Sequence, residues 1–186
     1  MEKVQINNNL SIPMPVVLVG TKHDEKINFM TVGWVTRVNS VPPIIGIGIN
    51  KAHLTNANIR ATGKFSINFP DTKLIPKTDY CGIVSGHKKD KSNVFETFYG
   101  SLDVPMIKDC PITLECELVN TIELPSNTFF IGEIKGVWSE QSVMNGNKLN
   151  FDLSDLLILT MPDNQYRAMT KPIAKAWNGA NKELTH

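Results

Sequence analysis

Four polar side chains stand together where a predicted strand ends and a predicted helix begins: Asn50, Lys51, His53 and Thr55. The first turn of a helix has free N–H groups and a positive dipole end, so anions bind there. Lys51 adds a charge, and the other three side chains can donate hydrogen bonds to phosphate oxygens. The spacing therefore indicates a phosphate site. The alternative is ordinary helix capping, with Asn50 or Thr55 as the N-cap and Lys51 in solvent.

The strands before this cluster carry small residues beside a large aromatic. Thr31 and Gly33 share one face next to Trp34, and Gly46 and Gly48 share a face of the following strand. Glycine weakens a strand, so two on one face indicate close approach of a ligand or of another backbone. Thr31 can hydrogen-bond a ring heteroatom, and the backbone at Gly33 can approach a planar ring. These features suit a flat ligand; the alternatives are a core aromatic at Trp34 and a barrel bend at Gly33.

No self-sufficient catalytic set is visible in the sequence. The segment from Gly46 to Gly48 begins like a dinucleotide-binding fingerprint, but the third glycine is missing and two prolines precede the strand. There is no P-loop, Ser-His-Asp order or pair of carboxylates at a catalytic spacing. If the protein is an enzyme, its chemistry therefore belongs to a bound cofactor.

Cys81 begins a polar loop in which Lys88, Lys89 and Lys91 follow. A nucleophilic thiol needs a nearby base and a lowered pKa, and no His or Asp stands at a suitable spacing. We therefore interpret Cys81 as a ligand-contacting or structural cysteine. Residues 85–91 either close over a ligand or form a mobile surface loop.

Short apolar or alternating stretches dominate the chain and predict strands. Gly132 and Gly136 lie in the longest of them and permit the bends that a barrel needs. The short spacing and the few helices favour a closed antiparallel barrel over a βαβ sheet, with any ligand outside it or at a subunit interface. The predicted strands are residues 15–21, 27–38, 44–49, 64–69, 112–118, 128–138 and 156–160.

Four helices are also expected. The first covers residues 50–62 and ends near Gly63, and the second covers residues 71–80 and is broken by Pro76. A third over residues 92–98 would turn its apolar side chains inward. The fourth lies in the tail from residue 169 to residue 177.

Composition excludes several classes of function. The 186-residue chain has a net charge of +1, so a nucleic-acid-binding surface is not expected. No apolar run is long enough for a membrane span, and the N-terminus has no apolar signal core. Three cysteines without CxxC spacing and four scattered histidines fit a cytoplasmic protein with no metal site.

Several short motifs, taken in order, resemble the flavin reductase-like family, which includes the flavoredoxins. They are NFMTxxW from Asn28, PPIIxI from Pro42, NKxHxT from Asn50 with Asn58 after it, and DYCGIVSG from Asp79 followed by an Asp-Lys pair. The last motif is similar to a loop of an anaerobe-type subgroup. The resemblance runs from about residue 10 to about residue 170.

The resemblance implies a mainly β fold with peripheral helices, an antiparallel Greek-key split β-barrel that binds FMN. It also implies a homodimer with the flavin near the subunit interface. The chain is then a single domain over residues 1–186, with a helical tail over residues 168–186.

By the same resemblance, the isoalloxazine ring borders the stretch from Met30 to Trp34. The ribityl phosphate is held by the polar cluster described above, and the subgroup loop covers the flavin. No residue receives a catalytic role. The full set of implied cofactor contacts is Met30, Thr31, Val32, Gly33, Trp34, Gly48, Ile49, Asn50, Lys51, His53, Thr55, Cys81, Gly82 and Lys91.

The family implies an oxidoreductase that passes hydride or electrons between NAD(P)H, or a redox protein, and the flavin. A non-enzymatic FMN electron carrier is the alternative that the flavoredoxins suggest. A flavin-free interaction module that kept the barrel is a third hypothesis.

Overall fold

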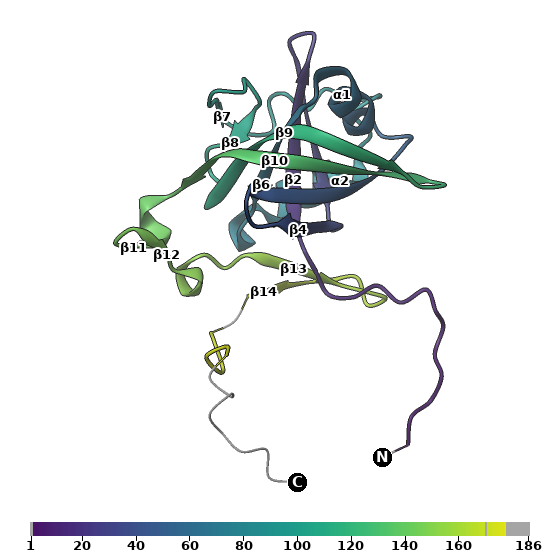
Figure 1. Ribbon diagram of the computed structural model, residues 1–186, viewed down its shortest axis with the longest axis vertical. Helices are drawn as coiled ribbons and strands as arrows, with labels where there is room; N and C mark the ends of the chain where they lie inside the picture. The colour runs from purple at the N-terminus through teal and green to yellow at the C-terminus, as the bar shows by residue number, and fades with distance from the viewer. Residues whose placement is uncertain (1, 170, 178–186) are drawn as a thin grey trace.

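The molecule is organised around one seven-stranded antiparallel sheet. Its computed structural model describes residues 2–169 and 171–177 (Figure 1). The strand order is β3-β2-β6-β9-β10-β5-β4. In chain order these strands are β2 (Val17–His23), β3 (Lys26–Val32), β4 (Val35–Asn39), β5 (Ile44–Asn50), β6 (Lys64–Phe69), β9 (Ile112–Glu123) and β10 (Asn127–Ser139).

Only Gly33 and Trp34 separate β3 from β4, yet these strands lie at opposite edges of the sheet. A flat sheet of seven strands would hold its edges about 29 Å apart, at about 4.8 Å per strand. The chain from Val32 to Val35 spans at most about 11 Å. The sheet therefore has to curl until its edges approach each other. In the described chain the two edges share no ladder, so no strand pairing closes the barrel along this seam.

Two short helices and several small elements surround the sheet. The helices are α1 (Leu54–Thr62) and α2 (Ile75–Ile83), with single 3-10 turns η1 (Thr72–Leu74), η2 (Gln141–Val143) and η3 (Phe151–Leu153). A second sheet, in the order β1-β13-β14, lies beside the barrel (Figure 1). The minor strands are β1 (Met14–Pro15), β7 (Thr97–Phe98), β8 (Met106–Ile107), β11 (Met144–Asn145), β12 (Lys148–Leu149), β13 (Leu157–Thr160) and β14 (Gln165–Ala168).

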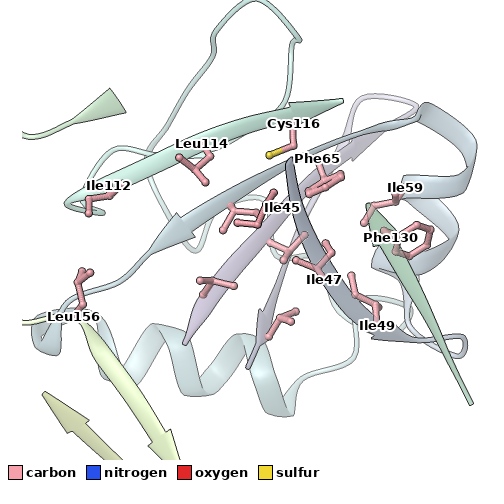
Figure 2. Close-up of a cluster of buried hydrophobic side chains, with 14 residues drawn as sticks. Ile45, Ile47, Ile49, Ile59, Phe65, Ile112, Leu114, Cys116, Phe130 and Leu156 are labelled. Atoms are coloured by element: carbon pink, nitrogen blue, oxygen red, sulfur yellow. The ribbon is translucent and has the colours of Figure 1, made fainter. Parts of the chain in front are cut away.

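The interior of the barrel is filled by alternate residues of its strands. Ile45, Ile47 and Ile49 of β5 all face inward, where they join Phe65 and Phe130 in one buried cluster (Figure 2). The alternation of β5 leaves its glycines on the outer face. There a side chain at Gly46 would collide with the ring of Phe129, and one at Gly48 would press on Trp34. The close neighbours of these glycines are therefore aromatic side chains.

The predicted bends of the longest strand are confirmed. The register between β9 and β10 shifts at Gly132 and again at Gly136. At Gly132 a side chain would collide with Phe65, so the glycine lets β10 cross closely over the core.

Three expectations were wrong in detail. The strand predicted over residues 27–38 is interrupted at Gly33 and Trp34, because the chain crosses there from one sheet edge to the other. Pro76 does not break a helix; it lies in the first turn of α2, where a missing N–H costs nothing. Residues 92–98 form turns and β7, because Phe98 pairs with Met106 of β8.

The helical tail was also wrong within the described residues. Ala168 ends strand β14, and residues 171–177 contain no helix. The rest of the predicted tail, residues 178–186, lies outside the described residues.

Candidate functional site

A pocket of about 370 Å³ lies along the seam, and we name it the seam pocket. Its walls come from β3, the two-residue link, β5, the turn between β9 and β10, and β13. Most of its side chains are apolar or small, as a flat aromatic ligand requires. The lining residues are Met14, Met30, Thr31, Val32, Gly33, Trp34, Gly48, Asn50, His53, Ser126, Asn127, Leu159 and Met161.

A second pocket, of about 250 Å³, adjoins the first, and we name it the cradle pocket. Met30 and His53 line both, so the two pockets are neighbours. The cradle pocket lies between the start of α1, the end of α2 and the loop that follows α2. Its lining residues are Asn28, Met30, Ala52, His53, Leu54, Thr55, Cys81, Gly82, Ile83, Val84, Ser85, Gly86 and Lys91.

The cradle pocket is placed to receive an anion. His53 is the N-cap of α1, with an extended backbone and no capping bond from its side chain. The first-turn amides of Leu54 and Thr55 have no acceptor within the helix, and both residues line the pocket. The capping alternative for Asn50 and Thr55 is therefore wrong, and the helix end is left available to a ligand.

Asn28 supports the floor of the cradle pocket. It is buried, and its Nδ2 donates a 2.8 Å hydrogen bond to Thr55 Oγ1. Its Oδ1 is buried without a partner among the described residues. Since buried polar atoms are nearly always paired, this oxygen is an acceptor that the described residues leave unsatisfied.

Lys91 is a buried cation in the wall of the cradle pocket, with only 3% of its surface exposed. Its Nζ donates to the carbonyls of Phe29 at 3.0 Å and Cys81 at 3.1 Å, and thereby ties β3 to the end of α2. Burial lowers the pKa of Lys91, and the nearby Cys81 partly offsets this shift. Within the described chain no carboxylate lies within 4 Å of it, so its charge is available to an anion in the pocket.

His53 stands where the two pockets meet. Burial lowers its pKa, and the charges of Lys91 and His87 lower it further. These effects favour the neutral imidazole, in which one ring nitrogen can donate a hydrogen bond.

Two predicted contacts lie elsewhere. Lys51 lines neither pocket; its Nζ forms an ion pair with Glu123 at 3.1 Å. Ile49 is fully buried in the core. Asn50 belongs to the seam pocket rather than the cradle pocket, and its Oδ1 accepts a 2.9 Å bond from the Ala52 amide.

Thr31 and Trp34 differ in how they meet the seam pocket. The Thr31 hydroxyl donates to the carbonyl of Thr78 in α2, so its proton is already used and cannot be donated to a ring. Trp34 is 55% exposed, so the alternative of a core aromatic is wrong. Val32, Gly33 and Gly48 also line the seam pocket.

Cys81 and Gly82 lie in the last turn of α2 and line the cradle pocket. Burial raises the pKa of the Cys81 thiol to about 11, against a smaller opposing effect of Lys91. A neutral, buried thiol is a poor nucleophile, which agrees with our interpretation of Cys81 as a contacting or structural residue.

Several lining residues were missed by sequence reasoning. Ser126 and Asn127 lie where the chain turns into β10, and Leu159 and Met161 belong to a strand and a loop far along the chain. The sequence does carry a signal for Asn28, because a polar amide side chain stands there between the apolar residues Ile27 and Phe29 of a strand.

Other kinds of site find no support in residues 2–169 and 171–177. No group of three or more His, Cys, Asp or Glu side chains is arranged to hold a metal ion. In the same residues, every helix is too short or too polar to span a membrane.

Comparisons with known proteins agree with this geometry. The family model described as "Flavin reductase like domain" matches residues 10–168. A flavoredoxin from Methanosarcina acetivorans is 48% identical, with a TM-score of 0.94 over 97% of this chain and 98% of that one. A flavoredoxin from Desulfovibrio vulgaris (Miyazaki F) is 32% identical, with a TM-score of 0.88 over 98% and 100%.

An FMN-binding protein from Thermus thermophilus shares the fold. It is 22% identical, with a TM-score of 0.81 over 94% of this chain and all of that one.

The protonation state of Cys81 is open to a direct test. With a pKa of about 11 instead of 9.0, its thiolate share at pH 8 is about a hundredfold lower than that of a free thiol. We expect iodoacetamide to leave Cys81 unmodified in the native protein and to label it once the chain is unfolded in urea. Peptide mass spectrometry measures both. Rapid labelling of native Cys81 at pH 8 would contradict this description of the site.

Proposed function

The chain belongs to the flavin reductase-like family, and from this premise we propose that it is an FMN-dependent oxidoreductase. Hydride or electrons pass between NAD(P)H, or a redox protein, and the flavin. The observation that carries the proposal is that the apolar seam pocket and the cationic cradle pocket are neighbours and share Met30 and His53. FMN has the same two parts, a planar ring and a phosphate.

The residues present fit this cofactor. Met30, Val32, Trp34 and Gly48 offer a mainly apolar bed to a ring, and the backbone at Gly33 and Gly48 leaves it room. The first-turn amides of α1, His53 and the buried Lys91 offer donors and positive charge to a phosphate. The unpartnered Oδ1 of Asn28 can accept a hydrogen bond from a hydroxyl of the ribityl chain.

Bound FMN supplies the hydride and electron chemistry that no side chain of the site can supply. The protein residues orient the ligand and keep water from its buried face. His53 is the one titratable side chain that lines the seam pocket among the described residues. This supports chemistry that depends on positioning and polarity rather than on an acid–base pair.

The alternative is an FMN electron carrier that exchanges electrons with a protein partner. It is the role that the resemblance to the flavoredoxins implies, and the likeness to two solved flavoredoxins favours keeping it. The exposed Trp34 at the rim of the seam pocket is compatible with either role, since a nucleotide and a protein could both reach it.

Reduction of the FMN-loaded protein by nicotinamide nucleotides separates the two roles. We expect NADH or NADPH to bleach the visible absorbance of bound flavin rapidly and to sustain turnover with an added acceptor. Slow bleaching by both nucleotides, with fast reduction by a ferredoxin-type protein, would favour the carrier. Protein that takes up no FMN would refute both.

The cradle pocket predicts which side chain near α1 matters for phosphate. We expect His53→Ala to weaken FMN binding about tenfold or more, because a hydrogen bond to a charged group contributes about 1.5–3 kcal/mol. Riboflavin, which lacks the phosphate, should bind the variant as it binds the parent.

Lys51→Ala is the matched control for that measurement. Lys51 lies outside both pockets and pairs with Glu123, so its removal should change FMN affinity less than about threefold, within the range of a surface ion pair. Fluorescence titration measures all three proteins. Equal losses for FMN and riboflavin in His53→Ala would contradict the phosphate assignment.

We also propose that the protein is a homodimer with the flavin near the interface. The N-terminal arm supports this, because Val4, Ile6, Leu10 and Ile12 are all exposed and apolar. Leu10 and Ile12 also line a groove of about 790 Å³ that reaches Trp34. We expect light scattering to give twice the chain mass for the full chain and a lower mass after removal of residues 1–12. A monomeric full chain would contradict the proposal.

A further inference from the structure

The ammonium of Lys91 joins two segments of the chain that form different walls of the site. Its Nζ donates to the carbonyl of Phe29 in β3 at 3.0 Å and to the carbonyl of Cys81 in α2 at 3.1 Å. β3 contributes Met30 and Thr31 to the seam pocket, and the end of α2 contributes Cys81 to the cradle pocket. One side chain therefore connects a wall of one pocket to a wall of the other.

The two carbonyls lack a backbone partner for different reasons. β3 pairs only with β2, so the backbone groups on its other edge have no ladder partner. The Phe29 carbonyl lies on that edge, because the hairpin ladder uses every second residue from the closing pair His23 and Lys26. Cys81 lies in the last turn of α2, where carbonyls have no amide within the helix to bond and where no basic side chain stands. Lys91 supplies the donor that both the strand edge and the helix end lack.

The residues after Lys91 keep it in this position. The Lys91 carbonyl accepts from the Val94 amide at 3.2 Å, and the ring of Phe95 packs edge-on against Phe29 with the ring centroids 5.2 Å apart. Lys91 is 3% exposed, and in the described part of the chain no carboxylate lies within 4 Å of its ammonium. The charge of this buried ammonium is therefore directed at two backbone carbonyls rather than at an acidic side chain.

The segments that Lys91 joins also touch each other at the ring bed. Thr31 Oγ1 donates to the carbonyl of Thr78 in α2. A Cβ atom at Gly82 would lie 3.4 Å from the Cβ of Thr31, so the last turn of α2 lies against β3. Because packed segments transmit a displacement to their neighbours, movement of the end of α2 is passed to Thr31, which lines the seam pocket.

We propose that Lys91 is a positioning residue for the flavin ring, in addition to offering its charge to the phosphate. It holds the end of α2 against the open edge of β3 and thereby keeps the wall of the seam pocket in place. This inference rests on the proposed function, which places the ring in the seam pocket and the phosphate in the cradle pocket. Without the ammonium, the buried carbonyls of Phe29 and Cys81 lose their donor, and α2 has to move away from β3 before water can reach them.

Riboflavin separates the two effects of Lys91, because it has the ring of FMN and lacks the phosphate. If Lys91 acted only as a charge for the phosphate, its removal would weaken FMN and leave riboflavin unchanged. If Lys91 positions the ring, both flavins bind less tightly, and the surroundings of the bound ring change.

The test compares the parent chain with Lys91→Met and with the matched control Lys89→Met. Methionine keeps an unbranched, flexible side chain in the buried position but has neither a donor nor a charge. Lys89 is exposed, belongs to the same loop and lines neither the seam pocket nor the cradle pocket, so the control removes the same charge without the carbonyl contacts. Fluorescence titration gives the dissociation constants of FMN and riboflavin, and visible circular dichroism at saturating FMN reports the surroundings of the ring.

We expect Lys91→Met to weaken riboflavin about tenfold and FMN at least as much, and to alter the visible circular dichroism of bound FMN. Lys89→Met should change both affinities by less than about twofold and leave the spectrum unchanged. Melting temperatures control for stability, because a general loss of stability leaves the spectrum of the folded, FMN-saturated protein as it is in the parent.

Two further provisions keep the test decisive. If Lys91→Met does not fold, Lys91→Gln takes its place with the same expectations, because its amide is uncharged and the side chain is too short to reach both carbonyls. Where riboflavin binds the parent too weakly to titrate, the spectrum of bound FMN decides alone.

An unchanged riboflavin affinity and an unchanged ring spectrum in the Lys91 variant, with FMN alone weakened, would overturn the inference and leave Lys91 as a charge for the phosphate. A parent chain that binds neither flavin would instead refute the proposed function on which the inference rests.

Discussion

The two-residue link from Val32 to Val35 constrains the whole molecule. It joins the opposite edges of a seven-stranded sheet, so the sheet must curl, and the edges approach without pairing. The seam that results is where Met30, Gly33, Trp34 and Gly48 come together as one pocket wall. The same curl that makes the hydrophobic core therefore also leaves the site open.

Electrostatics at the other end of the site depends on burial rather than on net charge. Lys91 is held by two carbonyls inside the wall, and α1 begins beside it with free amides. The charge of Lys91 and the dipoles of these amides both act at short range in a partly buried environment, where charges are screened less than at the surface. Lys51, which is nearer to the helix in sequence, is half exposed and already paired with Glu123. A chain that is almost neutral overall thus presents a locally positive pocket.

Much of the fold could be predicted from local pattern. The alternation of β5, the end of α1 at Gly63 and the bends at Gly132 and Gly136 follow from side-chain period and from glycine geometry. The errors arose where tertiary contacts override local preference. Residues 92–98 have the apolar spacing of a helix, yet Phe95 packs edge-on against Phe29 and Phe98 pairs with β8. Pro76 has the local signature of a helix breaker, and only the position at which α2 begins shows that it lies in the first turn.

The sequence by itself determined which residues have suitable chemistry, which face of each strand they share and which family the motifs resemble. It placed His53 at a helix start and the small residues beside Trp34 correctly. Only the tertiary structure decided that Lys51 pairs with Glu123, that Lys91 is buried in the wall, and that Leu159 and Met161 complete the seam pocket. The physical reason is that side chains alternate along a strand, so the sequence fixes the face of the sheet on which each one lies. Which residue that side chain then contacts depends on how far the sheet curls.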